Sequence, residues 1–406
     1  MNMKNNDYGG QLNIWEAVQT AATVNETKQI CHARVGELQK RSYGELVEDG
    51  RRAAAFISES SSDSTPVCIC LGGYLAAALV LACSYLGRDI TVCTEKAAGI
   101  SFNGEDGRVF ISADRLLPII SGTDPLRDPA RNVPDHHGIL ITFRSATGFE
   151  RSYSEASALL AAFAFADVTG LSRMDRFMTC LPCDDPRGLF CGLLAPIAVG
   201  SHLFFCDRGE ELMSCLGLCS PTKLFCSELL SSALLLRLEK IRKKTARNDK
   251  LSLRGVNFLT PERLLLRRLV NPRITLALGG RLRTLITSGG LSDRQTISLF
   301  SMGVFSIMIM SLDGLSPALF RTACDKKGVW HLPKGCISDL FGVGKGGMGR
   351  LALSSPFQRE GKAVPFSLIA GEKRSEPQAS DEFIMTDLFG FVLRDGSVFT
   401  VDKPQS

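Results

Sequence analysis

Short apolar runs alternate with longer helical patterns along the first three quarters of the chain. The run Val67 to Leu71 is short and β-rich, and Tyr74 to Leu86 is an Ala/Leu segment of helical length. Gly72 and Gly73 separate the two, and a second short run, Ile90 to Cys93, follows. A strand, a tight turn, a helix and a strand in this order predict a parallel sheet with right-handed crossovers.

The same alternation continues as far as Met310. Further strands are expected at Gly138–Phe143, Phe177–Leu181, Ser201–Cys206, Thr222–Phe225, Leu282–Ile286 and Val304–Met310. Helices are expected at Tyr43–Ile57, Ser154–Ala166, Leu189–Val199, Ser227–Lys244 and Arg294–Met302. After Gly314, short β runs such as Gly349–Ser354 and Gly396–Val401 alternate with Gly-rich loops. We therefore expect an α/β body over residues 1–314 and a smaller β-rich subdomain over 315–402.

Composition supports a soluble globular protein. The 406 residues are 45% hydrophobic and 22% charged, with a net charge of +5 spread along the chain. Mild basicity suits a phosphate-bearing ligand but does not indicate nucleic acid. The cluster Arg237 to Lys250 follows the apolar run Leu229 to Leu238, and we interpret it as a solvated helix end and expect no nucleic-acid partner.

Cysteine usage and the N-terminus indicate a cytoplasmic location. Most of the fourteen cysteines lie inside apolar runs, as buried reduced thiols do, and Met1 to Gln11 lacks the apolar core of a secretory signal. Val67 to Gly87 is uncharged over about one membrane span. Its flanks carry no charge asymmetry and two glycines divide it, so we expect no membrane span, and membrane association stays the third reading.

A loop with small hydroxylated residues follows the strand that ends at Phe143. Its sequence is Arg144-Ser-Ala-Thr-Gly-Phe-Glu-Arg-Ser152. Backbone amides and hydroxyls of such a loop can surround phosphate oxygens, and a following cation offsets their charge. Alone this pattern is weak, because most Ser/Thr/Gly loops are turns.

In this loop the chain resembles the adenylate-forming (ANL) superfamily, which includes acyl- and aryl-CoA synthetases, fatty-acyl-AMP ligases and nonribosomal adenylation domains. The phosphate loop of that superfamily runs T-S-G-T-T-G-x-P-K-G. Thr147 and Gly148 are kept here, Arg151 stands at the lysine, Ser145 replaces a glycine and Glu150 replaces the proline.

The resemblance continues in order along residues 12 to 403. Its other segments are Leu181–Leu189 with Gly192 (family L-P-L-x-H-x-x-G-L), Leu282–Gly290 (S-G-G/A), Met310–Gly314 (Y-G-x-T-E), Gly349–Phe357 (G-E-L-x-V-x-S-P) and Met385–Asp387 with Asp395–Gly396 (T-G-D). Each match is weak, and the order and spacing carry the resemblance.

The resemblance implies an ANL-type large domain with stacked mixed sheets, flanking helices and a smaller β-rich part. It also implies ATP and Mg²⁺ as cofactors and no dedicated metal site built from protein side chains alone. By motif position, the expected catalytic residues are Arg151 and Asp313. Expected nucleotide-binding residues are Ser145, Thr147, Gly148, Ser288, Gly289, Gly290, Met310 and Asp387, and expected substrate-binding residues are Asp185 and Gly192.

The departures fall on residues that matter for catalysis. Gly314 stands at the Mg²⁺-holding glutamate, although Asp313 next to it can supply a carboxylate. Met310 replaces the tyrosine that packs on adenine, and Asp185 replaces the histidine. Residues 403–406 fall where the family hinge begins, so we expect the small C-terminal domain (the lid), with its bridging lysine, to be absent. Lys403 is not expected to replace that lysine.

Two functions remain beside the membrane reading. In the first, the protein activates an acyl or aryl acid with ATP, weakly or with a separate lid domain, and passes it to CoA or an acyl-carrier protein. In the second, it is an inactive relative that binds an acyl group, a carrier protein or a nucleotide in a biosynthetic complex. The fold-level argument favours the ligase.

Other motifs are weaker evidence of function. Cys180 and Cys183 form a C-x-x-C, but neither a thioredoxin-like unit nor closely spaced further zinc ligands accompany it. Gly342 to Gly349 lacks the spacing and the hydroxyl of a P-loop, and the five scattered histidines form no catalytic triad or ligand set.

Overall fold

The computed structural model describes residues 13–25, 27–34, 36–61, 66–93, 98–104, 107–126, 139–144, 150–206, 209–245, 268–269, 271–312, 315–334, 336–343, 347–354 and 384–401. Its α-helices are α1 (Ile14–Asn25), α2 (Tyr43–Ser60), α3 (Gly73–Leu86), α4 (Ala113–Gly122), α5 (Glu155–Thr169), α6 (Ala195–Val199), α7 (Leu212–Cys219), α8 (Glu228–Thr245), α10 (Pro272–Ala277) and α11 (Asp293–Ser301). A π-helix, η1 (Arg187–Leu194), precedes α6, and a 3₁₀ turn, η2 (Gly209–Glu211), precedes α7.

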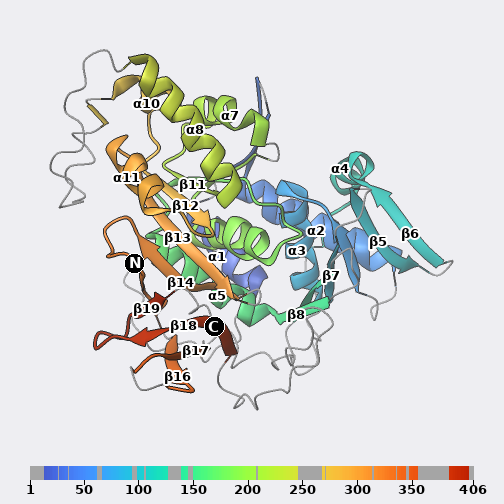
Figure 1. Cartoon of the computed structure of the whole chain (residues 1–406). Coiled ribbons are helices and arrows are strands. Elements are labelled where there is room, and N and C mark those ends of the chain that lie inside the picture. The colour runs from blue at the N-terminus through green and yellow to red at the C-terminus, as the bar shows by residue number, and fades with distance from the viewer. Residues whose placement is uncertain are drawn as a thin grey trace.

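Two mixed sheets form the body (Figure 1). The six-stranded sheet has the order β6 (Gly107–Ser112), β5 (Gly99–Gly104), β3 (Val67–Cys70), β4 (Ile90–Cys93), β7 (Leu140–Arg144), β8 (Glu150–Ser154). The eight-stranded sheet has the order β14 (Leu315–Thr322), β13 (Phe305–Leu312), β12 (Thr284–Ser288), β11 (Lys223–Ser227), β9 (Arg176–Thr179), β10 (His202–Phe205), β1 (Gln29–Arg34), β2 (Glu37–Ser42). In the larger sheet, β13 through β1 run parallel, and the two edge strands are antiparallel.

The main core lies between these two sheets. Helices α1, α2, α3, α5 and α6 contribute to it together with residues from both sheets. In the eight-stranded sheet, Phe177 and Phe225 point into this core, whereas their neighbours Met178 and Leu224 belong to a second core on the other face. Period-2 alternation with both faces apolar is what a sheet covered on both sides requires.

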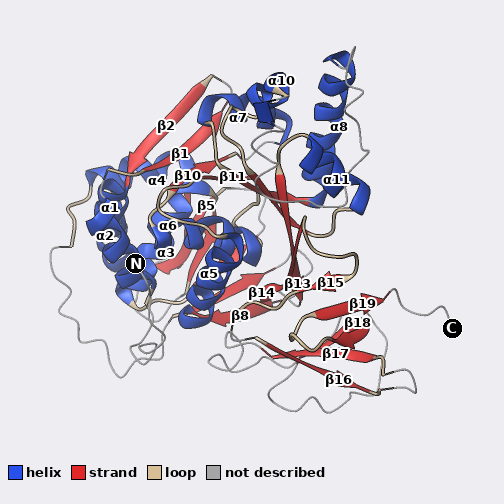
Figure 2. Cartoon of the chain, turned by 90° about the vertical axis from the view of Figure 1, so that its left-hand side faces the viewer, coloured by secondary structure: helices blue, strands red, loops and turns tan. Residues whose placement is uncertain are grey.

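The second core is covered by helices α7, α8, α10 and α11 and by a small sheet. That five-stranded sheet has the order β15 (Val329–Trp330), β19 (Val398–Val401), β18 (Ile384–Val392), β17 (Gly349–Ser354), β16 (Ile337–Phe341). Leu351, Leu353 and Val398 of this sheet join the second core with Leu285 and Met308 of the large sheet. Figure 2 shows the small sheet below β13 and β14.

The α/β fold expected from the sequence is confirmed, and so are its strand–helix–strand units. Among the described residues, none of the helices is long and apolar enough to cross a bilayer. The run Val67 to Gly87 folds as β3, a turn and the buried helix α3. The division at residue 314 stays a proposal. Because β14 pairs with β13 in the large sheet, the pairing favours a boundary between residues 322 and 329.

Candidate functional site

Three side chains meet where β9 and β12 end at the carboxyl edge of the large sheet. Arg187 Nε donates to both carboxylate oxygens of Asp185, at 2.8 and 3.1 Å, and Arg187 Nη2 also pairs with Asp185. Arg187 Nη1 donates to Ser288 Oγ at 2.8 Å. Asp185 and Arg187 follow β9, and Ser288 is the last residue of β12. In open α/β sheets, ligands bind beyond the carboxyl ends of the strands.

The π-helix that carries Arg187 packs closely on the preceding segment. An added Cβ at Gly188 would lie 1.7 Å from the Pro182 carbonyl oxygen, and one at Gly192 would lie 2.7 Å from Thr179 Oγ1. Both positions therefore need glycine. The helix expected over 189–199 is a π-helix up to Leu194 and an α-helix only from Ala195. π-Helical turns are rare in proteins, and those that do occur often lie at functional sites.

The Ser288–Gly289–Gly290 segment is shaped by its first glycine. Gly289 has φ of 124° and donates its N–H to the Ile309 carbonyl at 3.0 Å. A Cβ there would lie 2.9 Å from a carboxylate oxygen of Glu228, whereas one at Gly290 would have nothing within 4 Å. Gly290 is therefore exposed, with open space beside its backbone.

Charge in this cluster is partly balanced. Hydrogen bonding to Asp185 raises the pKa of Arg187, so the guanidinium stays protonated. Burial, followed by the neighbouring charge of Asp185, raises the pKa of Asp184. The negative charge of Asp185 is thus offset by Arg187, a residue that the family motif did not single out. Its signal in the sequence was a basic residue two positions after the histidine replacement.

The expected phosphate-binding region is described only at its flanks. Arg151 lies on β8 opposite Phe143 of β7 and is half-buried. Arg144 pairs with Glu150 at 2.6 Å where the two strands meet the loop. Ser145, Thr147 and Gly148 lie outside the described residues, as do Asp313 and Gly314.

The other expected site residues lie on separate elements. Met310 is half-buried on β13 and packs against the second core, and Gly192 is buried inside η1. Asp387 is on β18 with 97% of its side chain exposed, and it pairs with Arg350 at 3.2 Å. Their contacts with nucleotide or substrate stay predictions. Groups of three or more side chains able to hold a metal ion are absent from the described part of the chain.

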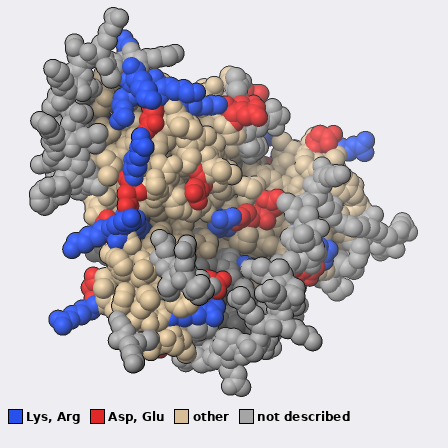
Figure 3. All heavy atoms as spheres, viewed as in Figure 1, with Lys and Arg blue, Asp and Glu red and all other residues tan. Residues whose placement is uncertain are grey.

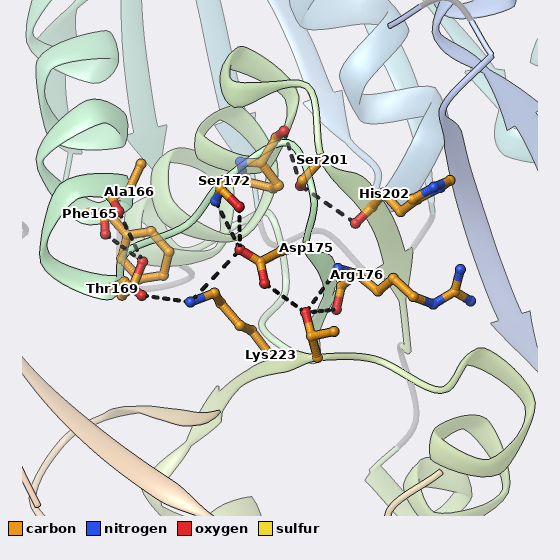
Figure 4. Close-up of polar contacts among 11 residues, drawn as sticks. Phe165, Ala166, Thr169, Ser172, Asp175, Arg176, Ser201, His202 and Lys223 are labelled. Atoms are coloured by element: carbon orange, nitrogen blue, oxygen red, sulfur yellow. Dashed lines mark hydrogen bonds and ion pairs between the residues drawn. The ribbon is translucent and has the colours of Figure 1, made fainter. Parts of the chain in front are cut away.

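A second polar cluster, at the opposite edge of the sheet, is structural. Asp175 accepts from the Ser172 hydroxyl and the Thr222 hydroxyl, both at 2.9 Å, and Lys223 donates to the Thr169 carbonyl at 2.8 Å (Figure 4). These bonds join the end of α5 to the starts of β9 and β11. Nearby, burial lowers the pKa of His202 to about 4, so this histidine is neutral at pH 7.

Comparison with known proteins shows the fold. A scan of protein-family models finds no match, and neither does a search of curated protein sequences. Among solved structures, a benzoate CoA ligase from Burkholderia xenovorans LB400 is similar at TM-score 0.64 and 14% identity, over 96% of this chain and 79% of that one. The N-terminal domain of FACL13 from Mycobacterium tuberculosis gives TM-score 0.67 at 12% identity, over 96% and 100% of the two chains.

VinN, in a complex with L-aspartate, gives TM-score 0.63 at 13% identity, over 96% of this chain and 98% of that one. The expected fold is therefore confirmed: the chain is folded like the large N-terminal domain of the adenylate-forming ligases. Identities of this size establish fold and not chemistry.

Proposed function

Because the chain is folded like the large domain of acid-activating ligases, we propose that it activates a carboxylic acid with ATP as an acyl-AMP or acyl-CoA ligase. The observation that carries this proposal is the Asp185–Arg187–Ser288 cluster at the carboxyl edge of the sheet, between the two segments matched to the acid and adenine sites. Acid-CoA ligases among its structural neighbours support the same class of reaction.

In this proposal the nucleotide lies over the Ser288–Gly289–Gly290 segment, whose open backbone at Gly290 accepts a flat base. Arg151 stands near the phosphates, and Asp387 turns from Arg350 to the ribose hydroxyls. Mg²⁺ would offset charge on the β- and γ-phosphates, with Asp313 as the available carboxylate. The cation that acts between carboxylate and α-phosphate comes from a lid domain outside these 406 residues, and CoA or a carrier protein accepts the acyl group.

Calorimetry with ATP and with AMP, each with and without Mg²⁺, tests nucleotide binding. We expect heat of binding below millimolar ligand and weaker binding by the Asp387→Ala variant, because two ribose hydrogen bonds to a charged group are lost. The variant Asp339→Ala, which alters an exposed aspartate of β16 in the same sheet, serves as the control. A folded protein that gives no heat at millimolar ATP or AMP contradicts this proposal.

A separate observation supports the alternative that the protein is an inactive relative of these ligases. Gly314 supplies no side-chain ligand where the family uses glutamate, and Asp387 is held by Arg350 in this structure. If acids bind but nucleotides do not, the protein is an acyl-binding relative without ligase chemistry.

A further inference from the structure

The Arg187 guanidinium carries donor groups beyond those that its internal contacts use. Its bonds to Asp185 and Ser288 occupy Nε and one N–H on each terminal nitrogen. A guanidinium has five N–H groups in one plane, so these contacts leave two of them for another acceptor. Arg187 is 38% exposed and Asp185 is 26% exposed, so the pair is accessible to a ligand.

The position of Arg187 is fixed by backbone packing. It is the first residue of η1, and Gly188 next to it lies against the Pro182 carbonyl. Arg187 N also donates to Asp185 Oδ1 at 2.8 Å, which holds the turn before the π-helix. A cation held on rigid backbone loses little entropy when it binds an anion.

We propose that Arg187 determines substrate specificity by binding a second anionic group of the acid, so that the substrate is a small dicarboxylic acid or a similar dianion. This inference rests on the proposed function and deepens it. Asp185 acts as the internal counter-ion that the ligand carboxylate partly displaces. A planar guanidinium binds a carboxylate through two parallel N–H···O bonds, which a monocarboxylic acid of the same length cannot supply at its distal end.

The alternative occupants fit less well. A long alkyl chain or an unsubstituted aromatic ring placed against Asp185 and Arg187 would remove water from an ion pair without replacing its hydrogen bonds. Asp184 next to the pair is half-buried, and an apolar occupant would remove water from this carboxyl group as well. Its negative charge opposes an anion, so the attraction for a second carboxylate must come from Arg187.

Calorimetry with succinate and butyrate tests the inference, because the two acids have the same carbon number and differ in one carboxylate. Benzoate and octanoate are run beside them, all in the presence of AMP, with the full 406-residue chain. We expect succinate to bind at least about 10-fold more tightly than butyrate. Arg187→Gln should weaken the binding of succinate by about 10- to 100-fold and leave the binding of butyrate nearly unchanged.

Two further variants separate specificity from structure. Asp185→Asn removes the competing carboxylate and should tighten succinate binding several-fold, whereas Arg187→Lys keeps the charge and should recover part of the affinity. Arg41→Gln, which breaks a remote 3.3 Å pair with Glu45 on α2, is the control, and thermal unfolding verifies that each variant is folded.

If butyrate, benzoate or octanoate binds as tightly as succinate, or if Arg187→Gln weakens all acids equally, the inference is wrong and the ligase proposal stands. If none of the acids binds, both the inference and the acid-activation proposal are wrong. Opposite effects of Asp185→Asn and Arg187→Gln on succinate are the result expected only from anion binding.

Discussion

Glu155, the first residue of α5, is buried and holds two other helices. Its carboxylate accepts from the Ile14 N–H at 2.6 Å and from the Ser84 hydroxyl, which ties α1 and α3 to α5. Burial raises its pKa above the usual carboxyl range. A raised folded-state pKa gives stability that is fully present below the unfolded value, about 4.3, and is lost as pH rises through the folded value.

We therefore expect Glu155→Gln to be less stable than the natural protein at pH 4, by about 1 kcal/mol, and to lose this deficit as the pH rises to 7. Glutamine keeps a carbonyl acceptor and carries no charge at either pH. Urea unfolding at several pH values measures the difference in free energy of unfolding. A difference in free energy of unfolding that does not change with pH would show that the pKa of Glu155 is the same in the folded and the unfolded protein.

Gly192 offers a test of packing in η1. Gly192→Ala places a methyl group 2.7 Å from Thr179 Oγ1, and we expect a loss of about 1–3 kcal/mol in the free energy of unfolding. Gly217→Ala on α7 is the matched control, because its added methyl meets nothing within 4 Å and should stabilise by about 0.5–1 kcal/mol. Equal effects of the two substitutions would contradict the close packing of η1.

At the scale of elements, α3 is the helix whose sequence most resembles a membrane span. Leu79 in its centre is fully buried, so Leu79→Ala should cost about 2–5 kcal/mol. Leu229 on α8 is 84% exposed, and Leu229→Ala should change stability by less than about 0.5 kcal/mol. Thermal or urea unfolding of the purified protein without detergent checks both. A protein that needs detergent to stay folded would favour the membrane reading.

Local sequence patterns predicted most helices and strands, but they did not predict that one helix is a π-helix. The strand expected at Gly349–Ser354 matches β17 in full, because a short apolar run between a Gly-rich loop and Ser355-Pro356 is typical of a short strand. The start of α2 was also readable, since Ser42 and Glu45 form a capping box. The π-helix was not, because it depends on the approach of Gly188 to Pro182, which sequence periodicity does not record.

The site was predictable only in part for a similar reason. Motif order placed Asp185 and Ser288 in one site, and the structure shows Arg187 bonded to both. Arg187 itself was missed because its role comes from a contact between residues 101 positions apart. The family motif L-P-L-x-H-x-x-G-L leaves position 187 unspecified, so it gives no weight to the residue there.

At the scale of the whole molecule, the order of strands was the least accessible feature. The change of pattern after Met310 predicts an α/β body followed by a β-rich part, and the family resemblance implies the stacked sheets. Neither predicts that β14 pairs back into the large sheet. Basic residues were expected to be a solvated helix end, and Arg237, Lys240 and Lys243 are exposed on α8, where Figure 3 shows Lys and Arg gathered.

In the proposed ligase reaction, two separate charges would set the catalytic power of the whole molecule. Gly314 lacks the Mg²⁺-holding carboxylate on the pyrophosphate side, and the lid lysine acts on the side of the carboxylate and α-phosphate. Gly314→Glu alone should therefore leave activity low. A lid domain supplied in trans should raise it more, by about 10²–10³-fold, because a placed cation contributes several kcal/mol in the transition state.

Acid-dependent exchange of pyrophosphate into ATP tests the central claim most directly. The 406-residue chain is assayed alone, as Gly314→Glu, and with a lid domain in trans, over short, dicarboxylic, aromatic and long-chain acids. We predict slow exchange by the chain alone, little gain from Gly314→Glu, and a large gain from the lid domain with one class of acid. Rapid exchange by the unmodified chain, or no exchange with any acid once the lid is supplied, would contradict the account.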